Sequence, residues 1–187
     1  MSISTSYKKS AIVTLIVMIF VITLGSLYFL FRDQSEVQKR NNTPAATALL
    51  PDEGAPSFTN LQGKAVTMAP YFGSVIVATS WASWCPQCVT DISRLGEVAE
   101  LYKDKEVVVL AVNRAEDKFT AERFLQTAAI PEGVQVILDS EDFYFKNSAG
   151  YAMPETIVFG KDGTILLQQR GELRLDELKQ TLDKALE

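Results

Sequence analysis

The stretch WASWCPQC, residues 81–88, holds both cysteines of the 187-residue chain, Cys85 and Cys88. A metal site, a haem attachment site, a structural disulfide and a redox-active pair all use two cysteines at this spacing. A zinc site needs about four Cys or His ligands, and the chain has two cysteines and no histidine, so a zinc site within one chain is excluded. A c-type haem requires a histidine directly after the second cysteine, where Val89 stands. A structural disulfide and a redox-active pair remain.

The two cysteines lie where a predicted strand gives way to a predicted helix. Residues 74–81 are an apolar, β-branched run of strand length, and Pro86 suits the first position of a helix, where a backbone N–H is not needed. Cys85 then takes the N-cap position, where the helix dipole favours a thiolate. Cys88 lies one turn further in, so we expect Cys85 to attack and Cys88 to resolve. Closing so short a loop stabilises a fold little, which argues against a purely structural disulfide.

Strands and helices alternate through the middle of the chain. Apolar runs over 106–113 and 134–139 follow the first strand, with amphipathic stretches over 86–103 and 117–129 between them. This order predicts a parallel core with right-handed crossovers. The residues expected to face the core are Val89, Ile92, Leu95, Ala99 and Tyr102 in the first helix, and Phe119, Phe124 and Ala128 in the second.

Antiparallel hairpins are predicted on either side of this core. Residues 155–171 contain two β runs joined by Lys-Asp-Gly, and residues 57–68 have the pattern of an earlier hairpin. An amphipathic helix closes the chain. We therefore expect one α/β domain over 55–187, with a mixed sheet and helices on both of its faces.

The N-terminal part of the chain predicts a membrane anchor. Residues 11–31 carry no charged side chain and are long enough to cross a hydrocarbon core of about 30 Å. The run is longer than the apolar region of a cleaved signal peptide, and no A-x-A-like cleavage site follows it. We expect an uncleaved transmembrane helix, with residues 1–10 as a short cytoplasmic head and residues 32–54 as a flexible linker. The Lys and Arg counts on the two sides do not decide the orientation.

The composition narrows the range of partners. The chain has 18 basic and 23 acidic residues and a formal net charge of −5. Nucleic-acid binding relies on basic surfaces, so we do not expect a nucleic acid as partner. We expect neither a metal nor another cofactor.

WASWCPQC, together with the later segment AMPETIVFGKDGTI (152–165), resembles the thioredoxin superfamily. More narrowly, the chain resembles the membrane-anchored TlpA/ResA/DsbE-like thiol-disulfide oxidoreductases, which include reductases of cytochrome c maturation. The resemblance runs from about Pro56 to the C-terminus. It implies a thioredoxin-like fold, a thiol or disulfide protein as substrate, and an upstream electron donor in the membrane. It also implies a place on the bacterial inner membrane, with the soluble domain on the extracytoplasmic side.

The resemblance also implies site residues. Cys85 and Cys88 match the redox pair, and Pro154 matches a cis-proline whose loop faces the disulfide. Met153 is then a candidate contact for the incoming thiol or disulfide. Asp91 matches an acidic position that moves protons near the buried cysteine, although the family usually has the longer Glu there. The alternative is a surface aspartate favoured by the helix dipole, and both interpretations stay open at this stage.

Four further residues lie near these motifs. We expect Trp84 at the surface, as part of a docking surface for the substrate, and Trp81 in the core. Thr79 occupies the strand position where thioredoxin proper has a buried acid, so Thr79 cannot replace Asp91 as a proton carrier. Glu155, beside Pro154, is expected to be a solvated strand residue.

Three functions are consistent with the CxxC motif to different degrees. Pro86 and Gln87 place no charge between the cysteines, which favours a reductase over a strong oxidant. A peroxiredoxin-like peroxidase needs Thr or Ser three residues before the reactive cysteine, and Ala82 stands there. A non-catalytic anchored binding module with a permanently closed disulfide is the other alternative.

Overall fold

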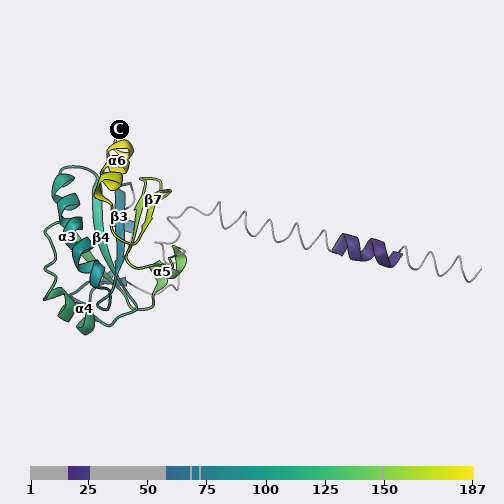
Figure 1. Ribbon diagram of the computed structural model, residues 1–187, viewed down its shortest axis with the longest axis horizontal. Helices are drawn as coiled ribbons and strands as arrows, with labels where there is room; N and C mark the ends of the chain where they lie inside the picture. Colours follow the sequence, from purple (N-terminus) through teal and green to yellow (C-terminus); the bar gives the residue numbers. More distant parts are fainter. Residues whose placement is uncertain (1–16, 26–57, 68, 72, 149) are drawn as a thin grey trace, which may run out of the picture. The chain divides into compact units, whose positions relative to one another are not determined.

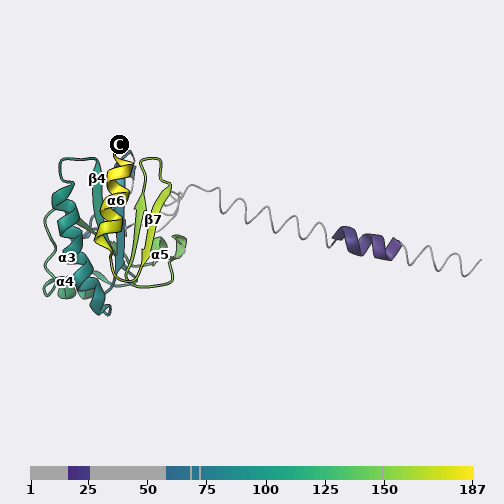
Figure 2. The ribbon, with the colours of Figure 1, turned by 45° about the horizontal axis from the view of Figure 1, so that its top comes forward.

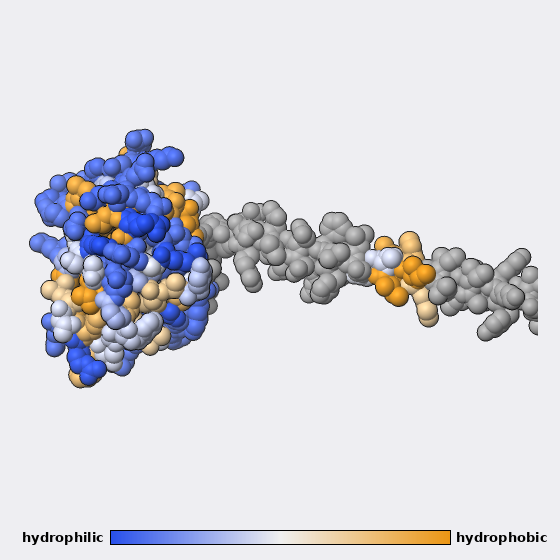
Figure 3. All heavy atoms as spheres, viewed as in Figure 1, coloured by the Kyte–Doolittle hydropathy of each residue, from blue (hydrophilic) through white to orange (hydrophobic). Residues whose placement is uncertain are grey.

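The computed structural model describes residues 17–25, 58–67, 69–71, 73–148 and 150–187. Residues 17–25 form a helix of mainly apolar, exposed side chains (Figure 3). The rest of the predicted 11–31 span, the head 1–10 and the linker 32–54 lie outside the described residues. Among the helices that the structure describes, none combines the length and the apolar character needed to cross a membrane.

A seven-stranded mixed sheet forms the centre of the unit over Pro44–Glu187 (Figure 1). Its middle strands β3 (Val75–Trp81), β4 (Val107–Arg114) and β5 (Val134–Asp139) pair in parallel. These are the three apolar runs of the sequence. Every residue of β3 is buried, as expected for a strand that is covered on both faces.

Antiparallel strands extend the sheet at both edges. β6 (Glu155–Phe159) pairs with β3, and β7 (Ile165–Arg170) pairs with β6. On the other side, β1 (Phe58–Thr59) and β2 (Ala65–Val66) form a short hairpin next to β5. The strand order is β2-β1-β5-β4-β3-β6-β7, and both predicted hairpins are confirmed.

Helices cover both faces of the sheet (Figures 1 and 2). α3 (Pro86–Leu101), α4 (Lys118–Leu125) and α6 (Leu175–Ala185) share one core with the sheet residues that they face. α5 (Phe143–Asn147) packs into a separate core on the opposite face, near the short 3-10 helix η1 (Ala69–Tyr71). The predicted mixed sheet with helices on both faces is confirmed.

Two residues predicted for the helix stripes lie outside the core. Val89 of α3 is exposed, whereas the other four residues of its stripe are buried. Phe119 of α4 is also exposed, because α4 buries Ala121 and Leu125 instead. Phe119 precedes Ala121 by two positions, which is about 200° around a helix, so the two side chains point in different directions. α4 ends at Leu125 rather than at residue 129, and Ala128 is buried beyond its end.

Gly96 allows α3 to approach the chain segment that leads into β5. The residue is buried in the middle of the helix. A Cβ atom at Gly96 would lie 2.3 Å from Pro131 Cβ and 2.6 Å from Pro131 Cγ. Because a proline ring has little freedom to move aside, the contact requires glycine on the helix side.

The variant Gly96→Ala tests this close contact. Alanine would raise helix propensity by about 1 kcal/mol, but overpacking against the proline ring costs about 1–3 kcal/mol. We therefore expect a net loss in the free energy of unfolding, measured by urea denaturation. Ser93→Ala, at an exposed position of the same helix, is the control and should leave stability unchanged or slightly higher. A stabilised Gly96→Ala protein would contradict the contact.

Candidate active site

Cys85 and Cys88 form a disulfide at the start of α3. The two Cα atoms are 5.4 Å apart and the S–S distance is 2.06 Å. Cys85 is the N-cap residue and Pro86 follows at the first helical position, as predicted. Cys85 is 4% exposed and Cys88 is 0% exposed, so Cys85 is the more accessible of the two by a small margin. The disulfide therefore lies just beneath the surface, at the positive end of a 16-residue helix.

Two tryptophans at the end of β3 occupy different environments. Trp81 is fully buried, and its ring stacks on that of Phe124 with 5.2 Å between the centroids. This contact fixes the end of β3 against α4. Trp84 is 62% exposed next to Cys85. Core packing for Trp81 and surface exposure for Trp84 are both confirmed.

A carboxylate from the end of β4 holds the turn that precedes Cys85. Glu116 Oε2 accepts hydrogen bonds from the Ser83 N–H at 3.0 Å and from Asn113 Nδ2 at 2.7 Å. Glu116 Oε1 accepts from the Ser83 hydroxyl at 2.5 Å. Ala115, with φ 57°, takes the left-handed conformation and turns the chain between Asn113 and Glu116. No local pattern in the sequence indicates this network, because its members lie up to 33 positions apart.

The loop before β6 lies at the same end of the strands as the cysteines, because β6 begins beside the end of β3. The Met153–Pro154 peptide bond is cis, as the resemblance implied. Met153 is half-buried and packs on the core cluster that contains Cys85 and Cys88. The Pro154 carbonyl accepts a hydrogen bond from the Gly171 N–H at 2.9 Å, which ties the loop to the segment after β7.

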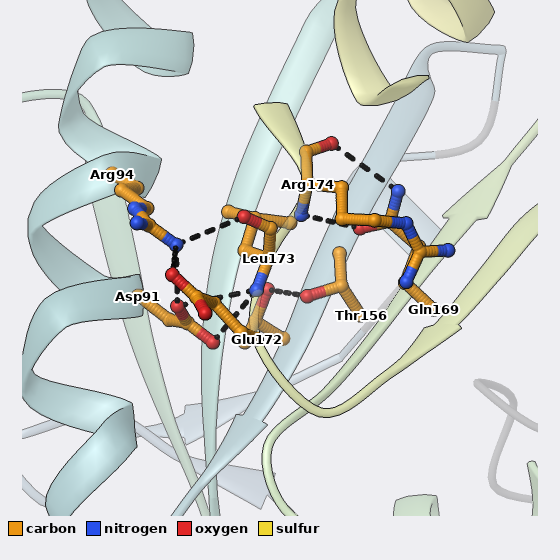
Figure 4. Close-up of polar contacts among 8 residues, drawn as sticks. Asp91, Arg94, Thr156, Gln169, Glu172, Leu173 and Arg174 are labelled. Carbon is orange, nitrogen blue, oxygen red and sulfur yellow. Dashed lines mark hydrogen bonds and ion pairs between the residues drawn. The ribbon is translucent and has the colours of Figure 1, made fainter. Parts of the chain in front are cut away.

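Asp91 is buried inside the protein, with 0% exposure. It lies three residues after Cys88, so the two side chains are neighbours on one face of α3. Its carboxylate accepts from the Leu173 N–H at 3.2 and 3.3 Å and lies 3.6 Å from Arg94 Nη1. Figure 4 shows Asp91 and Arg94 pointing from α3 toward the segment that carries Glu172 and Leu173. The interpretation of Asp91 as a surface residue is therefore wrong.

Burial raises the pKa of Asp91 above its ordinary value. The Leu173 N–H, the Arg94 guanidinium and the Gln87 side chain each lower it, and the Glu172 carboxylate raises it. The net effect is a raised pKa, because loss of water outweighs the favourable contacts. Because its pKa is raised, this carboxyl holds a proton more readily than an exposed aspartate does.

On the face of the sheet that α3 covers, the buried polar side chains of β3 and β6 are Thr79 and Thr156, and neither is ionisable. Thr79 is buried, and its hydroxyl lies 2.8 Å from that of Thr156 in a hydrogen bond between β3 and β6. This pair satisfies both hydroxyls and leaves Asp91 as the titratable group next to Cys88. Among the residues that the structure describes, no three His, Cys, Asp or Glu side chains gather in a way that would hold a metal ion.

Glu155 is buried, so its expected exposure to solvent is wrong. Its Oε1 accepts from Gln168 Nε2 at 3.1 Å and lies 3.0 Å from Arg170 Nε, and both partners are on β7. Burial raises the pKa of Glu155. Glu155 and Ile157 share one face of β6, and Ile157 belongs to the core on the α5 side. Glu155 therefore faces away from the side of the sheet that α3 and the disulfide cover.

The network around Glu116 gives a prediction for stability. Glu116→Ala leaves the Ser83 N–H and the Asn113 amide without their acceptor, and we expect a loss of about 1–3 kcal/mol in the free energy of unfolding. Glu122→Ala is the control, since Glu122 makes only an exposed ion pair with Lys118 at 3.5 Å and should cost less than about 0.5 kcal/mol. Equal losses in the two variants, measured by urea denaturation, would exclude a structural role for Glu116.

Comparison with known proteins places this geometry in a family. Residues 38–186 match the Redoxin family. The thiol-disulfide oxidoreductase ResA of Geobacillus thermodenitrificans is 24% identical over 139 residues, which cover 73% of this chain and 79% of the relative. The ResA protein of Bacillus thuringiensis subsp. konkukian is 24% identical over 132 residues, covering 70% and 75%.

Solved structures agree with this assignment. A putative thiol:disulfide interchange protein DsbE from Chlorobium tepidum has a TM-score of 0.64 and 27% identity, covering 71% of this chain and 93% of its own. A putative thioredoxin from Neisseria meningitidis has a TM-score of 0.59 and 28% identity, covering 70% and 87%. The chain therefore belongs to the Redoxin family and, within the thioredoxin superfamily, to the TlpA/ResA/DsbE-like thiol-disulfide oxidoreductases.

Proposed function

We propose that the chain reduces disulfides of proteins outside the cytoplasm, through Cys85 and Cys88, while anchored to the bacterial inner membrane. The observation that carries the proposal is the Cys85–Cys88 disulfide at the N-terminus of α3. The Pro154 loop lies at the same end of the central strands. Pro86 and Gln87 put no charge between the cysteines. A strong oxidant stabilises its attacking thiolate heavily, so this neutral pair favours the reductive direction.

In the reductive direction, the Cys85 thiolate attacks one sulfur of a substrate disulfide. The substrate S–S bond breaks, a mixed disulfide with Cys85 forms, and the first substrate sulfur leaves as a thiolate that takes up a proton. Cys88 then loses its proton and attacks Cys85 Sγ, which releases the second substrate thiol. The substrate has gained two electrons, and the chain holds the Cys85–Cys88 disulfide. A dithiol donor in the membrane returns the pair to its reduced form.

Asp91 is the proposed acceptor of the Cys88 proton. It is the buried carboxyl neighbour of Cys88 on α3, and burial raises its pKa toward the range useful for proton transfer. Thr79 and Thr156, whose hydroxyls are hydrogen-bonded to each other, have no ionisable group that could accept this proton. The exposed Trp84, the half-buried Met153 and the Pro154 backbone form the proposed contact surface for the substrate.

The substrate class rests on the family resemblance. Reductases of cytochrome c maturation act on apocytochrome c, so a disulfide in apocytochrome c is the proposed substrate. The non-catalytic module with a permanent disulfide is the competing function, and trapping of a mixed disulfide separates the two.

The proposed anchor rests on the uncharged run over 11–31, of which the helix over 17–25 is the described part. We expect the full-length chain to stay in the membrane pellet after alkaline carbonate extraction, because a spanning helix is not released by raised pH. A chain that starts at Ala55 should be soluble under the same conditions. Release of the full-length chain by alkali would contradict the anchor.

Trapping in native membranes tests the assigned roles of the cysteines. Cys88→Ala should leave a Cys85 thiolate that attacks but is not displaced, so reducible adducts with partner proteins should accumulate. Cys85→Ala should give few adducts, because Cys88 is less accessible. The double variant Cys85→Ala/Cys88→Ala is the control for adducts that do not involve either thiol, and the adducts are identified by mass spectrometry.

The outcomes discriminate between the functions. Adducts with Cys88→Ala alone support a catalytic pair with Cys85 as the attacking residue. Equal trapping by both single variants refutes the division of roles. No trapping by either variant refutes the reductase and favours the module with a permanent disulfide.

A further inference from the structure

The Arg94 guanidinium lies between the buried Asp91 carboxylate and the exposed Glu172 carboxylate. Arg94 Nη1 lies 2.6 Å from Glu172 Oε1, 3.0 Å from the Leu173 carbonyl oxygen and 3.6 Å from Asp91 Oδ1 (Figure 4). The Asp91 side chain is 0% exposed, that of Arg94 is 28% exposed and that of Glu172 is 59% exposed. The three charged groups therefore form a series that runs from the interior beside Cys88 to the surface.

The two carboxylates share the Arg94 guanidinium unequally. The ion pair with Glu172 has a separation of 2.6 Å, whereas the contact with Asp91 is a full ångström longer. The Leu173 carbonyl oxygen accepts a hydrogen bond from Arg94 Nη1, the same nitrogen. Arg94 is thus held mainly by the segment between β7 and α6, and it gives Asp91 only part of its positive charge. The negative charge of Glu172 offsets part of the effect that the Arg94 cation has on Asp91.

Two other charged groups near this place, Arg170 and Arg174, have partners of their own. Arg94, Glu172, Arg170, Arg174 and Asp176 are the charged residues that line a cavity of about 510 Å³ at the surface here. Arg170 pairs with Glu155 and Arg174 pairs with Glu177. The strands β3 and β6 present the neutral Thr79 and Thr156 on the face that α3 covers. Arg94, which contacts Asp91, and Glu172, which contacts Arg94, are the charged groups linked to Asp91 by the described contacts.

We propose that Arg94 and Glu172 act as an opposed pair of positioning residues that decides at which pH Asp91 gives up its proton. Arg94 favours the ionised carboxylate, and Glu172 weakens that effect by competing for the same nitrogen. The pair itself stands on the described contacts. Its effect on Cys88 rests on the proposed function, in which Asp91 takes the proton of Cys88 and passes it to water.

The two groups should have effects of opposite sign. Arg94→Met removes the cation, so Asp91 keeps its proton to higher pH. Glu172→Gln keeps an amide oxygen that can accept from Arg94 but removes the competing negative charge, so Asp91 loses its proton at lower pH. Damage to the fold would not produce shifts in opposite directions. The opposed signs therefore separate this proposal from a purely structural role.

The experiment is a titration of the full-length oxidised protein in detergent, followed by the ¹³C resonance of the Asp91 side-chain carboxyl. Asp91→Asn assigns the resonance. We expect the midpoint to move up by about one pH unit in Arg94→Met and down in Glu172→Gln. Arg94→Lys keeps the charge and should stay near the unmodified protein. If Arg94→Met does not fold, the downward shift in Glu172→Gln still tests the proposal, and no shift there would overturn it.

An exposed ion pair at the C-terminal end of α3 supplies matched controls. Lys103 and Glu100 contact each other at 2.6 Å at the far end of α3, where both side chains are exposed. Lys103→Met and Glu100→Gln change the net charge by the same amounts as the test variants, and neither should move the Asp91 midpoint measurably. Shifts of the same sign in the two test variants, or shifts no larger than in these controls, would overturn the proposal.

A second readout separates this inference from the proposed function. The rate at which reduced Cys88 resolves a mixed disulfide with a model thiol is measured against pH, and the profile should follow the Asp91 midpoint in each variant and lose that transition in Asp91→Asn. Opposed midpoints with an unchanged rate profile would support the Arg94–Glu172 pair and refute the role of Asp91 in catalysis. A profile that follows the midpoints supports both.

Discussion

The start of α3 at Pro86, five residues after the end of β3, is the constraint on which the site depends. A helix that begins there places Cys85 at the positive end of the dipole, Cys88 one turn inside and Asp91 a further turn along the same face. β3 is fixed by parallel pairing with β4 and antiparallel pairing with β6, and the Trp81–Phe124 stack fixes its end. The position of the sulfur atoms is therefore set by the rigid sheet, and the connecting turn adds little freedom because Glu116 holds it.

The C-terminal hairpin and the segment after it supply partners for two of the buried acids, Asp91 and Glu155. Asp91 receives the Leu173 N–H on the α3 side of the sheet, and Glu155 receives Gln168 and Arg170 on the other side. A buried carboxylate without such partners would cost several kcal/mol. β7 and the segment after it therefore also stabilise the interior, because without their partners neither Asp91 nor Glu155 would be tolerated there.

Local patterns in the sequence were sufficient for the central elements. Strands β3, β4 and β5 are continuous apolar runs, and the CPQC step carries its own helix-start signal in Pro86. The cis peptide bond before Pro154 came from the family resemblance, since only about 5% of X–Pro bonds in folded proteins are cis. The missed features depend on contacts between distant residues: Leu173 is 82 positions from Asp91, and Glu116 is 33 positions from Ser83. α5 has five residues, too few for a helical period to be recognised.

The position of the acid on a helix has a chemical consequence. In the proposed function, Asp91 must be ionised when it accepts the Cys88 proton, so we expect resolution of the mixed disulfide to speed up as the pH rises through the pKa of Asp91. Burial moves that pKa up, which makes the carboxylate a stronger base, and Arg94 moves it down, which favours the ionised form. The most effective base has a pKa close to the working pH, because basicity and the ionised fraction change in opposite directions. Burial and the partly shared arginine shift the pKa of Asp91 in opposite directions, so the balance between basicity and the ionised fraction depends on both features.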